Sequence, residues 1–470
     1  TPIKSSAASD VYKRQKLYIA ILLLAGVLTS CKVGKSYVRP DLHLPDSLER
    51  SQDSVSFGDQ DWRDIYTDAT LRSLIERALD HNKDMLIAAA RVKEMAAQKR
   101  ISTAALLPDI KGKVTGEREL ENHGGDAFKR SDTFEAQFLV SWEVDLWGNL
   151  RWARSASIAE YLQSIEAQRA LQMTIVAEVA QAYYELVALD TELDIVKQTL
   201  KAREEGVRLA RIRFAGGLTS ETSYRQAQVE LARTATLVPD LERKISLKEN
   251  DIAYLAGEYP NKIARSRLLQ EFNSPETLPV GLPSTLLERR PDIRQAEQKL
   301  IAANAKVGVA YTNMFPRLAL TGGFGSESTS LSELLKSPYA VMEGALLTPI
   351  FGWGKNRAAL KAKKAAYEAE VHSYEKSVLE AFKETRNAIV NFNKIKEVYE
   401  LRANLERSAK SYMDLAQLQY INGVINYLDV LDAQRGYFDA QIGLSNAIRD
   451  ELIAVVQLYK ALGGGWEQNP

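Results

Sequence analysis

"DLWGNLR" (Asp145–Arg151) and "FGWGKNR" (Phe351–Arg357) share one pattern: Trp-Gly, a small polar stretch and an Arg. Each follows a run typical of a β-strand and precedes a long segment without helix breakers, so each predicts a turn from strand into helix. The two Trp-Gly pairs are separated by 206 positions, which indicates that one structural unit occurs twice. The turn residues are Trp147 and Gly148 in the first copy and Trp353 and Gly354 in the second.

Other landmarks repeat in the same order along the chain, and their spacing is nearly constant. The pairs are Arg213–Leu218 with Gln419–Val424 and Ala227-Gln228 with Ala433-Gln434, both 206 positions apart, and Leu106–Glu117 with Met314–Gly325, 208 positions apart. Such agreement predicts an internal duplication with a first repeat over residues 71–256 and a second over 291–462.

Each repeat is expected to contain a helix, two strands and a long helical hairpin. The first helices span 83–106 and 291–314 and are ended by Pro108 and Pro316. The long helices run from about 149 to 214 and from 354 to 420, the second with apolar residues at alternating spacings of three and four, which is typical of a coiled coil. Glycines then mark a reversal into a return helix.

The strands suggest a membrane. Residues 134–146 alternate strictly between apolar and polar, which suits a spanning strand, although a half-buried strand of a globular sheet gives the same pattern. Residues 318–324 alternate more weakly, and 339–350 poorly. Four strands cannot close a barrel, and open edges are not tolerated in lipid. Two chains would give a plugged barrel, and three would give twelve strands with room for a pore.

The N-terminal region reads as a lipoprotein signal over residues 16–30. Lys16 precedes an apolar run, and Leu28-Thr29-Ser30-Cys31 matches a bacterial lipobox. Cleavage before Cys31 would leave a diacylglyceryl and N-acyl anchor on that residue; the alternative is a buried or free Cys after an uncleaved anchor. Residues 1–15 are expected to be non-native.

Composition excludes several functions. Lys plus Arg (61) balance Asp plus Glu (61), so nothing favours nucleic acid. The four histidines lack metal-ligand spacing, "GWGK" lacks the glycine and Ser or Thr of a phosphate loop, and no acid–base or nucleophile cluster stands out. No catalytic residue, metal or cofactor is therefore expected beyond the lipid.

Residues 278–325, "LPVGLPSTLLERRPDIRQAEQKLIAANAKVGVAYTNMFPRLALTGGFG", with "LDVLDAQR" at 428–435 and the duplicated Trp-Gly turns, resemble one family. It is the TolC-like outer-membrane factors, in particular the lipoprotein branch. The resemblance implies a mixed α/β homotrimer in which a 12-stranded β-barrel continues into a 12-helix periplasmic α-barrel. It also implies an equatorial belt formed by residues 31–70, the linker 257–290 and the C-terminal tail 463–470.

The resemblance further implies a periplasmic gate. Asp429 and Asp432 match aspartates that ring the closed aperture, although both also suit the start of a helix capped by Asn426. Tyr420 matches a closing link whose partners would be Thr222 and Ser223, whereas the family's arginine is replaced by Ile425. Closure is therefore expected to rest on packing around Tyr420, Leu428 and Leu431.

The hairpin tips are the expected docking sites for a periplasmic adaptor (membrane fusion) protein, and the tip residues are Gly216, Gly217, Leu218, Gly423 and Val424. The predicted function is an outer-membrane exit duct of a tripartite efflux pump with an RND-type inner-membrane transporter. It would be lipid-anchored in a Gram-negative outer membrane and extend into the periplasm. The rivals are a pore-less coiled-coil spacer and a periplasmic enzyme; the cargo is not predicted.

Overall fold

The computed structural model describes residues 32–42, 56–122, 124, 128–266, 269, 279, 283–348 and 352–466. Cys31, the signal segment, residues 1–15 and parts of the linker and C-terminal tail lie outside these described residues. The elements are η1 (Phe57–Asp59), α2 (Trp62–Ile65), α3 (Ala69–His81), α4 (Lys83–Ala104), β1 (Asp109–Glu121), β2 (Lys129–Val144), α5 (Asn149–Ala215), α6 (Glu221–Leu255), α7 (Pro283–Arg289), α8 (Pro291–Thr312), β3 (Arg317–Ser328), η3 (Leu331–Lys336), β4 (Pro338–Leu347), α9 (Trp353–Ile421) and α10 (Tyr427–Ala461).

The main helices of the two repeats agree in length, as the predicted duplication requires. Helices α4 and α8 each have 22 residues, α6 and α10 each have 35, and the long helices α5 and α9 have 67 and 69. The chain divides into two compact units, which are described separately. The sheet unit comprises residues 1–41, 92–164 and 296–375, and the hairpin unit comprises residues 42–91, 165–295 and 376–470.

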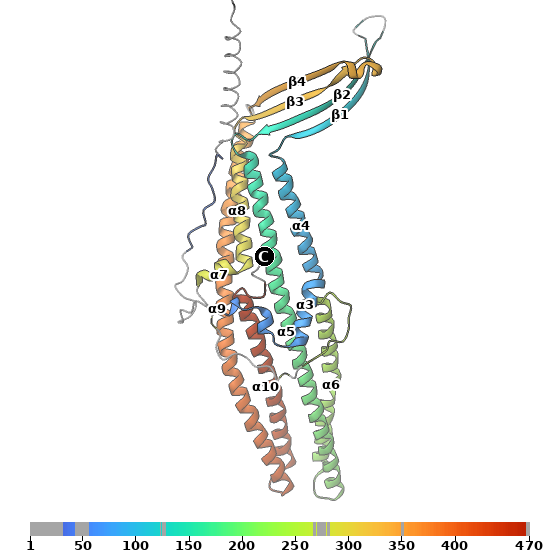
Figure 1. Cartoon of the computed structure of the whole chain (residues 1–470). Helices are drawn as coiled ribbons and strands as arrows, with labels where there is room; N and C mark the ends of the chain where they lie inside the picture. Colours follow the sequence, from blue (N-terminus) through green and yellow to red (C-terminus); the bar gives the residue numbers. More distant parts are fainter. Residues whose placement is uncertain are drawn as a thin grey trace, which may run out of the picture. The chain divides into compact units, whose positions relative to one another are not determined.

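In the sheet unit, the four strands form one antiparallel sheet in the order β1-β2-β3-β4 (Figure 1). The glycines of β1 are covered by aromatic rings of β2, since Gly112 pairs with Phe138 and Gly116 with Phe134. Such pairs stabilise strand positions that have no side chain of their own. Strands β1 and β4 are each paired on one side only, so both edges of the sheet remain open.

In the hairpin unit, the core lies where η1, α2 and α3 pack against the middle of α5 and the end of α10. The Phe57 ring meets that of Tyr459 edge-on at 5.4 Å, and the Tyr459 hydroxyl donates to the Gln60 carbonyl at 2.6 Å. Trp62, Tyr66 and Tyr183 belong to the largest fully buried side chains of the chain. A long helical hairpin buries little apolar surface by itself. This cluster therefore anchors the hairpins to η1, α2 and α3.

None of the helices among the described residues combines the length and the apolar character that a membrane-crossing helix needs.

Candidate functional site

The tips of the two helical hairpins have the same backbone. At the first tip, the Gly217 N–H donates to the Phe214 carbonyl at 2.9 Å and the Leu218 N–H to the Arg213 carbonyl at 2.8 Å. At the second, the Gly423 N–H donates to the Tyr420 carbonyl at 3.0 Å and the Val424 N–H to the Gln419 carbonyl at 2.9 Å. Gly217 and Gly423 have φ of 72° and 74°, as the left-handed residue of this helix-ending motif requires.

The predicted gate aspartates lie in the first two turns of α10. Asp429 accepts a hydrogen bond from the Asn426 N–H at 3.0 Å through Oδ2, so the helix-capping part of the prediction is present. Both Asp429 and Asp432 are exposed. They are three residues apart on a helix, so their carboxylates lie on the same face.

An apolar cluster joins the two hairpins beside these tips. Its buried members are Ala210, Ala227, Tyr427, Val430 and Leu431, and Val207, Tyr224, Tyr420 and Ile425 pack against it. The rings of Tyr420 and Tyr427 are 5.4 Å apart, and the Arg213 guanidinium lies 4.7 Å from the centre of the Tyr420 ring. Burial raises the pKa of the Tyr427 hydroxyl. Two of the three residues expected in the packing, Tyr420 and Leu431, therefore lie in this cluster.

Three other predicted gate residues lie outside the apolar cluster. Leu428 is exposed and lies outside the cluster, Thr222 is exposed, and Ser223 is half-buried. Ile425, which occupies the position of the family's arginine, packs against the apolar cluster instead of offering a hydrogen bond. This chain therefore has apolar contacts at the position where the family has an arginine.

A buried charge cluster, which sequence reasoning missed, also joins the hairpins. The Glu230 carboxylate on α6 binds Arg203 of α5 at 3.0 Å, Arg435 of α10 at 2.5 Å and Arg233 at 3.3 Å. The side chains of Glu230 and Arg203 are only 4 % and 5 % exposed. The hydrogen bond from Arg435 has the largest effect on the pKa of Glu230, and it lowers that pKa. Burial opposes this shift, and the charge of Arg203 lowers the pKa further. Arg435 belongs to the "LDVLDAQR" motif, but the sequence alone does not show that it pairs with Glu230.

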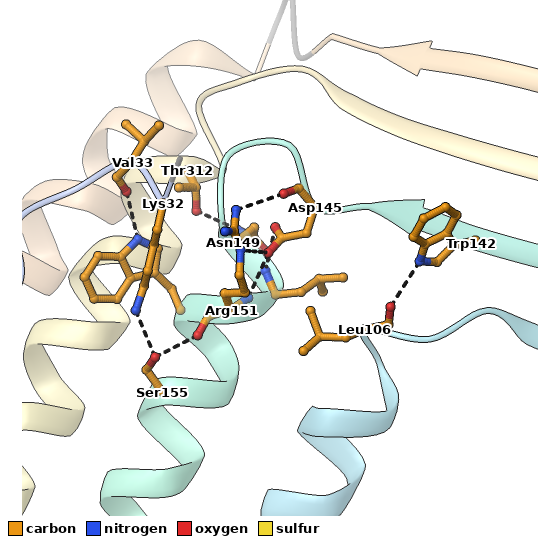
Figure 2. Close-up of polar contacts among 11 residues, drawn as sticks. Lys32, Val33, Leu106, Trp142, Asp145, Asn149, Arg151, Ser155 and Thr312 are labelled. Atoms are coloured by element: carbon orange, nitrogen blue, oxygen red, sulfur yellow. Dashed lines mark hydrogen bonds and ion pairs between the residues drawn. The ribbon is translucent and has the colours of Figure 1, made fainter. Parts of the chain in front are cut away.

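The first strand-to-helix turn is held by Asp145, which directly follows β2 (Figure 2). Its carboxylate accepts hydrogen bonds from the Leu150 N–H at 3.1 Å and from the Arg151 N–H and Nε at 3.0 Å each. The carboxylate therefore satisfies free N–H groups at the start of α5 and opposes the positive end of the helix dipole. Gly148 has φ of 82°, and a Cβ there would lie 2.9 Å from the side chain of Lys32.

The N-terminal segment that follows Cys31 is fastened to this turn. The Val33 N–H donates to the Trp147 carbonyl at 3.1 Å, and the Trp152 indole N–H donates to the Val33 carbonyl at 2.7 Å. The Lys32 ammonium lies 3.5 Å from the centre of the Trp152 ring and donates to Ser155 at 2.9 Å (Figure 2). Burial and then the neighbouring Arg151 lower the pKa of Lys32. The predicted lipidation residue thus immediately precedes a fixed segment.

The second strand-to-helix turn is built differently. Helix α9 begins at Trp353 itself, so Gly354 lies in the first helical turn. Trp353 is 54 % exposed, whereas the Trp147 indole N–H donates to the Pro316 carbonyl at 2.8 Å. The Asn356 amide binds the Asn313 carbonyl at 3.0 Å. Both Trp-Gly stretches therefore lie between a strand and a long helix, but only the first Trp is packed within the chain.

Among the described residues, no group of three or more His, Cys, Asp or Glu side chains is placed to hold a metal ion.

A sheet with two open edges, continued by helices of 67 and 69 residues in antiparallel hairpins, defines the class of outer-membrane channel proteins. The chain belongs to the outer membrane efflux protein family, whose pattern matches residues 74–258 and 282–464. The predicted family is thereby confirmed.

Relatives of the chain match it over almost its whole length. Outer membrane protein OprJ of Pseudomonas aeruginosa is 32 % identical over 471 residues, which cover 96 % of each chain. Cation efflux system protein CusC of Escherichia coli is 28 % identical, covering 95 % of this chain and 98 % of its own. The solved structure of the outer-membrane channel OprN superposes with a TM-score of 0.87 at 28 % identity, covering 93 % of this chain and 100 % of that chain.

The chain is therefore an outer-membrane efflux protein of a Gram-negative bacterium that extends into the periplasm. It is an exit duct and not an enzyme, and both the pore-less spacer and the periplasmic enzyme lose their support.

Proposed function

We propose that three copies of this chain form a homotrimeric duct that is closed at the hairpin tips by a ring of carboxylates. The open edges of the sheet support the trimer, because backbone groups at an unpaired edge cannot be left without partners in lipid. One copy supplies four strands, and three copies supply a barrel wide enough for a pore.

The observation that carries the gate is the exposure of Asp429 and Asp432 on one face at the start of α10. Three-fold symmetry would bring six carboxylates around the axis. Such a ring favours cations and resists anions. The Asn426 hydrogen bond to Asp429 keeps one carboxylate in place without neutralising it. Opening would be an untwisting of the return helices that carries these carboxylates apart.

The same tips would dock a periplasmic adaptor (membrane fusion) protein. Leu218 and Val424, which follow the glycines of the two tips, are both exposed apolar side chains. Exposed apolar side chains at two equivalent turns fit a partner that packs against each hairpin in a similar way. The duct would receive its cargo from an RND-type inner-membrane transporter. The relatives' names include cation and toluene efflux, so they do not assign one cargo.

The lipid anchor on Cys31, with its diacylglyceryl and N-acyl chains, is part of the same proposal. Its support is the fastening of Lys32 and Val33 to the strand-to-helix turn, the level at which membrane strands give way to periplasmic helices. A lipid attached one residue earlier would therefore stand next to the sheet.

Single-channel conductance of the purified protein in a planar lipid bilayer tests the gate. Asp429→Asn/Asp432→Asn is expected to raise the small conductance several-fold and to abolish cation selectivity. The matched control is Gln226→Ala, which changes the first-tip equivalent of Asp432 and should leave both properties as in the wild type. Equal conductance and selectivity in all three proteins would overturn the acidic gate and keep the duct.

A further inference from the structure

The register of the sheet unit gives the sheet two unlike faces. Phe138 of β2 lies between Gly112 of β1 and Phe324 of β3, and Phe324 pairs in turn with Ala340 of β4. Because side chains alternate along a strand, the even-numbered residues of all four strands share one face, which is called the apolar face here. Its exposed large apolar side chains include Ile110, Val114, Phe138, Val140, Leu320, Phe324, Met342 and Leu346.

The opposite face of the sheet is polar. The Glu135 carboxylate accepts hydrogen bonds there from Lys113 at 3.2 Å and from the Thr115 hydroxyl at 3.0 Å. The Tyr339 hydroxyl donates to the same carboxylate at 2.6 Å. In a membrane barrel the apolar face contacts lipid and the polar face lines the lumen.

The connections of the strands show which of their ends is the outer one. Helix α4 leads into β1 at Asp109, β2 leads into α5 after Val144, and α8 leads into β3 at Arg317. Since the helices extend into the periplasm, these ends of the strands are periplasmic. The opposite ends, at Glu121 and Lys129, therefore face the outside of the cell.

A charged cluster of three side chains interrupts the apolar face near its outer end. Arg118 of β1 pairs directly with Asp132 of β2, and Arg130 lies two residues from Asp132 on the same face. The two arginine side chains are 59 % and 54 % exposed, and that of Asp132 is 23 % exposed. Two guanidinium groups share one carboxylate, so the cluster has an excess of positive charge.

The carboxylate of Asp132 holds both guanidinium groups by the same edge. Arg118 donates to it through Nε at 2.7 Å and Nη2 at 3.4 Å, and Arg130 through Nε at 3.1 Å and Nη2 at 2.6 Å. The Nη1 amino groups take no part in these contacts. Because a guanidinium is planar and rigid, fixing one edge also fixes the direction in which the other edge donates.

The cluster lies at the outer boundary of the apolar band. Trp142, whose indole N–H donates to the Leu106 carbonyl at 3.0 Å, lies near the periplasmic end of β2, where barrels have an aromatic girdle. Asp132 is ten positions closer to the outer end of β2. At about 3.3 Å per residue and a tilt of about 40°, ten positions span about 25 Å, the height of the apolar band of membrane barrels. The arginines are therefore level with the lipid head groups of the outer leaflet.

We infer that Arg118 and Arg130 bind a phosphate group of the glycolipid that forms the outer leaflet of the membrane. The inference rests on the proposed barrel, in which the apolar face is turned to lipid. The two arginines donate to the phosphate oxygens, and the acyl chains of the same lipid lie against Val114 and Phe138 below them. Asp132 is the positioning residue that orients both donors.

Charge and position together specify this partner. The excess of positive charge favours an anion, and the planar donor fork of arginine matches the oxygens of a phosphate. The apolar face continues directly from the cluster toward the periplasm, so the anion that fits both is one that carries acyl chains. In the outer leaflet of a Gram-negative outer membrane, the phosphorylated glycolipid built on lipid A has both properties.

Lipid retention by the purified full-length protein tests the site. The protein is incubated in detergent with bisphosphorylated lipid A, and the lipid that stays bound to the trimer is counted by native mass spectrometry. Arg118→Gln/Arg130→Gln should retain at least about ten-fold less lipid than the wild type, because its charge-assisted hydrogen bonds are lost. The matched control Lys113→Gln/Lys129→Gln removes the same charge from the polar face and should retain lipid as the wild type does.

Two results of this measurement would overturn the inference. Equal retention by the wild type and the arginine variant shows that the arginines do not hold the lipid. Equal losses in both double variants show a response to net charge without a site. Light scattering of the same samples separates the inference from the proposed duct: trimers with unchanged lipid retention overturn the lipid site alone, and absence of trimers in the wild type overturns the duct.

Heat dissociation of the wild-type trimer tests the phosphate without any substitution. Bisphosphorylated lipid A should raise the dissociation temperature by a few degrees, and the same lipid without its phosphates should not. Inorganic phosphate should not replace the lipid, because it lacks the acyl chains that contact the apolar face. An equal rise with both lipids overturns phosphate recognition, and a full rise with inorganic phosphate overturns the lipid as the partner.

Discussion

The two hairpin tips have nearly identical backbones and different surroundings. Both end a long helix with a left-handed glycine and begin a return helix four residues later. At the first tip, Glu221 begins the return helix and is exposed; at the second, Tyr427 holds the equivalent position and is buried against the first hairpin. Local hydrogen bonds therefore set the conformation of each turn. The first side chain of the return helix determines whether the start of that helix packs against the other hairpin.

The difference makes α10 the element that joins the hairpins. It contributes three of the five buried members of the apolar cluster and Arg435 of the charge cluster. The return helix α6 contributes Ala227 and Glu230. A movement that opens the second tip must therefore break both an apolar and an ionic contact.

The largest effect is expected from Glu230→Gln. The substitution removes the negative charge of Glu230 and leaves the Arg203 guanidinium buried without a counter-charge. Loss of one partner of a buried ion pair costs about 3–5 kcal/mol. The free energy of local opening, measured from native-state proteolysis of the tips, should fall by that amount. Arg233→Gln is the control, because the Arg233 side chain is 67 % exposed and its loss should change the opening energy by less than about 1 kcal/mol. Equal effects of both variants would contradict a buried ionic contact.

The same carboxylate gives the tips a pH dependence with a definite sign. The pKa of Glu230 is lower in the folded protein than its ordinary value of 4.5, so its stabilisation is present above about pH 4.5. It is lost as the pH falls through the folded-state pKa. The opening energy of the wild-type tips should decrease below about pH 4.5 more steeply than that of Glu230→Gln.

Periodicity and breakers predicted α4, α8, the helical hairpins and the strands between them, but not the shorter helices α2, α3 and α7. The expected helix 149–214 and the observed Asn149–Ala215 differ by one residue, because helical period and glycine reversals are local signals. The Glu230 cluster could not be predicted, since its partners lie on three helices and its equivalents in the other repeat are absent: Gly436 replaces Glu230 and Ala409 replaces Arg203. The sequence also could not show that Trp353 is exposed while Trp147 is packed, because both lie in the same Trp-Gly pattern and only the structure separates them.

An intermediate and equal effect is expected from alanine at the two tip glycines. Gly217→Ala and Gly423→Ala each force a side chain into the left-handed region, which costs about 1–2 kcal/mol per residue. Nothing lies within 4 Å of a Cβ at either position, so strain alone decides the outcome. Gly436→Ala is the control inside α10, where alanine should stabilise by about 0.5–1 kcal/mol. Tip proteolysis that changes at only one of the two glycines would show that the two turns are not equivalent.

The smallest effect separates the two roles of the tip aspartates. Asp429→Asn weakens the contact with the Asn426 N–H and removes a negative charge from the first turn of α10, which should cost about 0.5–1 kcal/mol of opening energy.

Asp432→Asn removes the same charge one turn further along, where the helix end is less favourable to it, and should cost almost nothing. In a trimer it should even stabilise the closed tips slightly at low salt, because neighbouring carboxylates repel each other. Ser223→Asp supplies the first tip with the acid that only the second has, three residues after the N-cap Ser220, and should stabilise that tip by about 0.5 kcal/mol. If Asp429→Asn stabilised the tips as Asp432→Asn does, repulsion in the ring would outweigh capping, and the two tips would differ in electrostatics more than in helix ends.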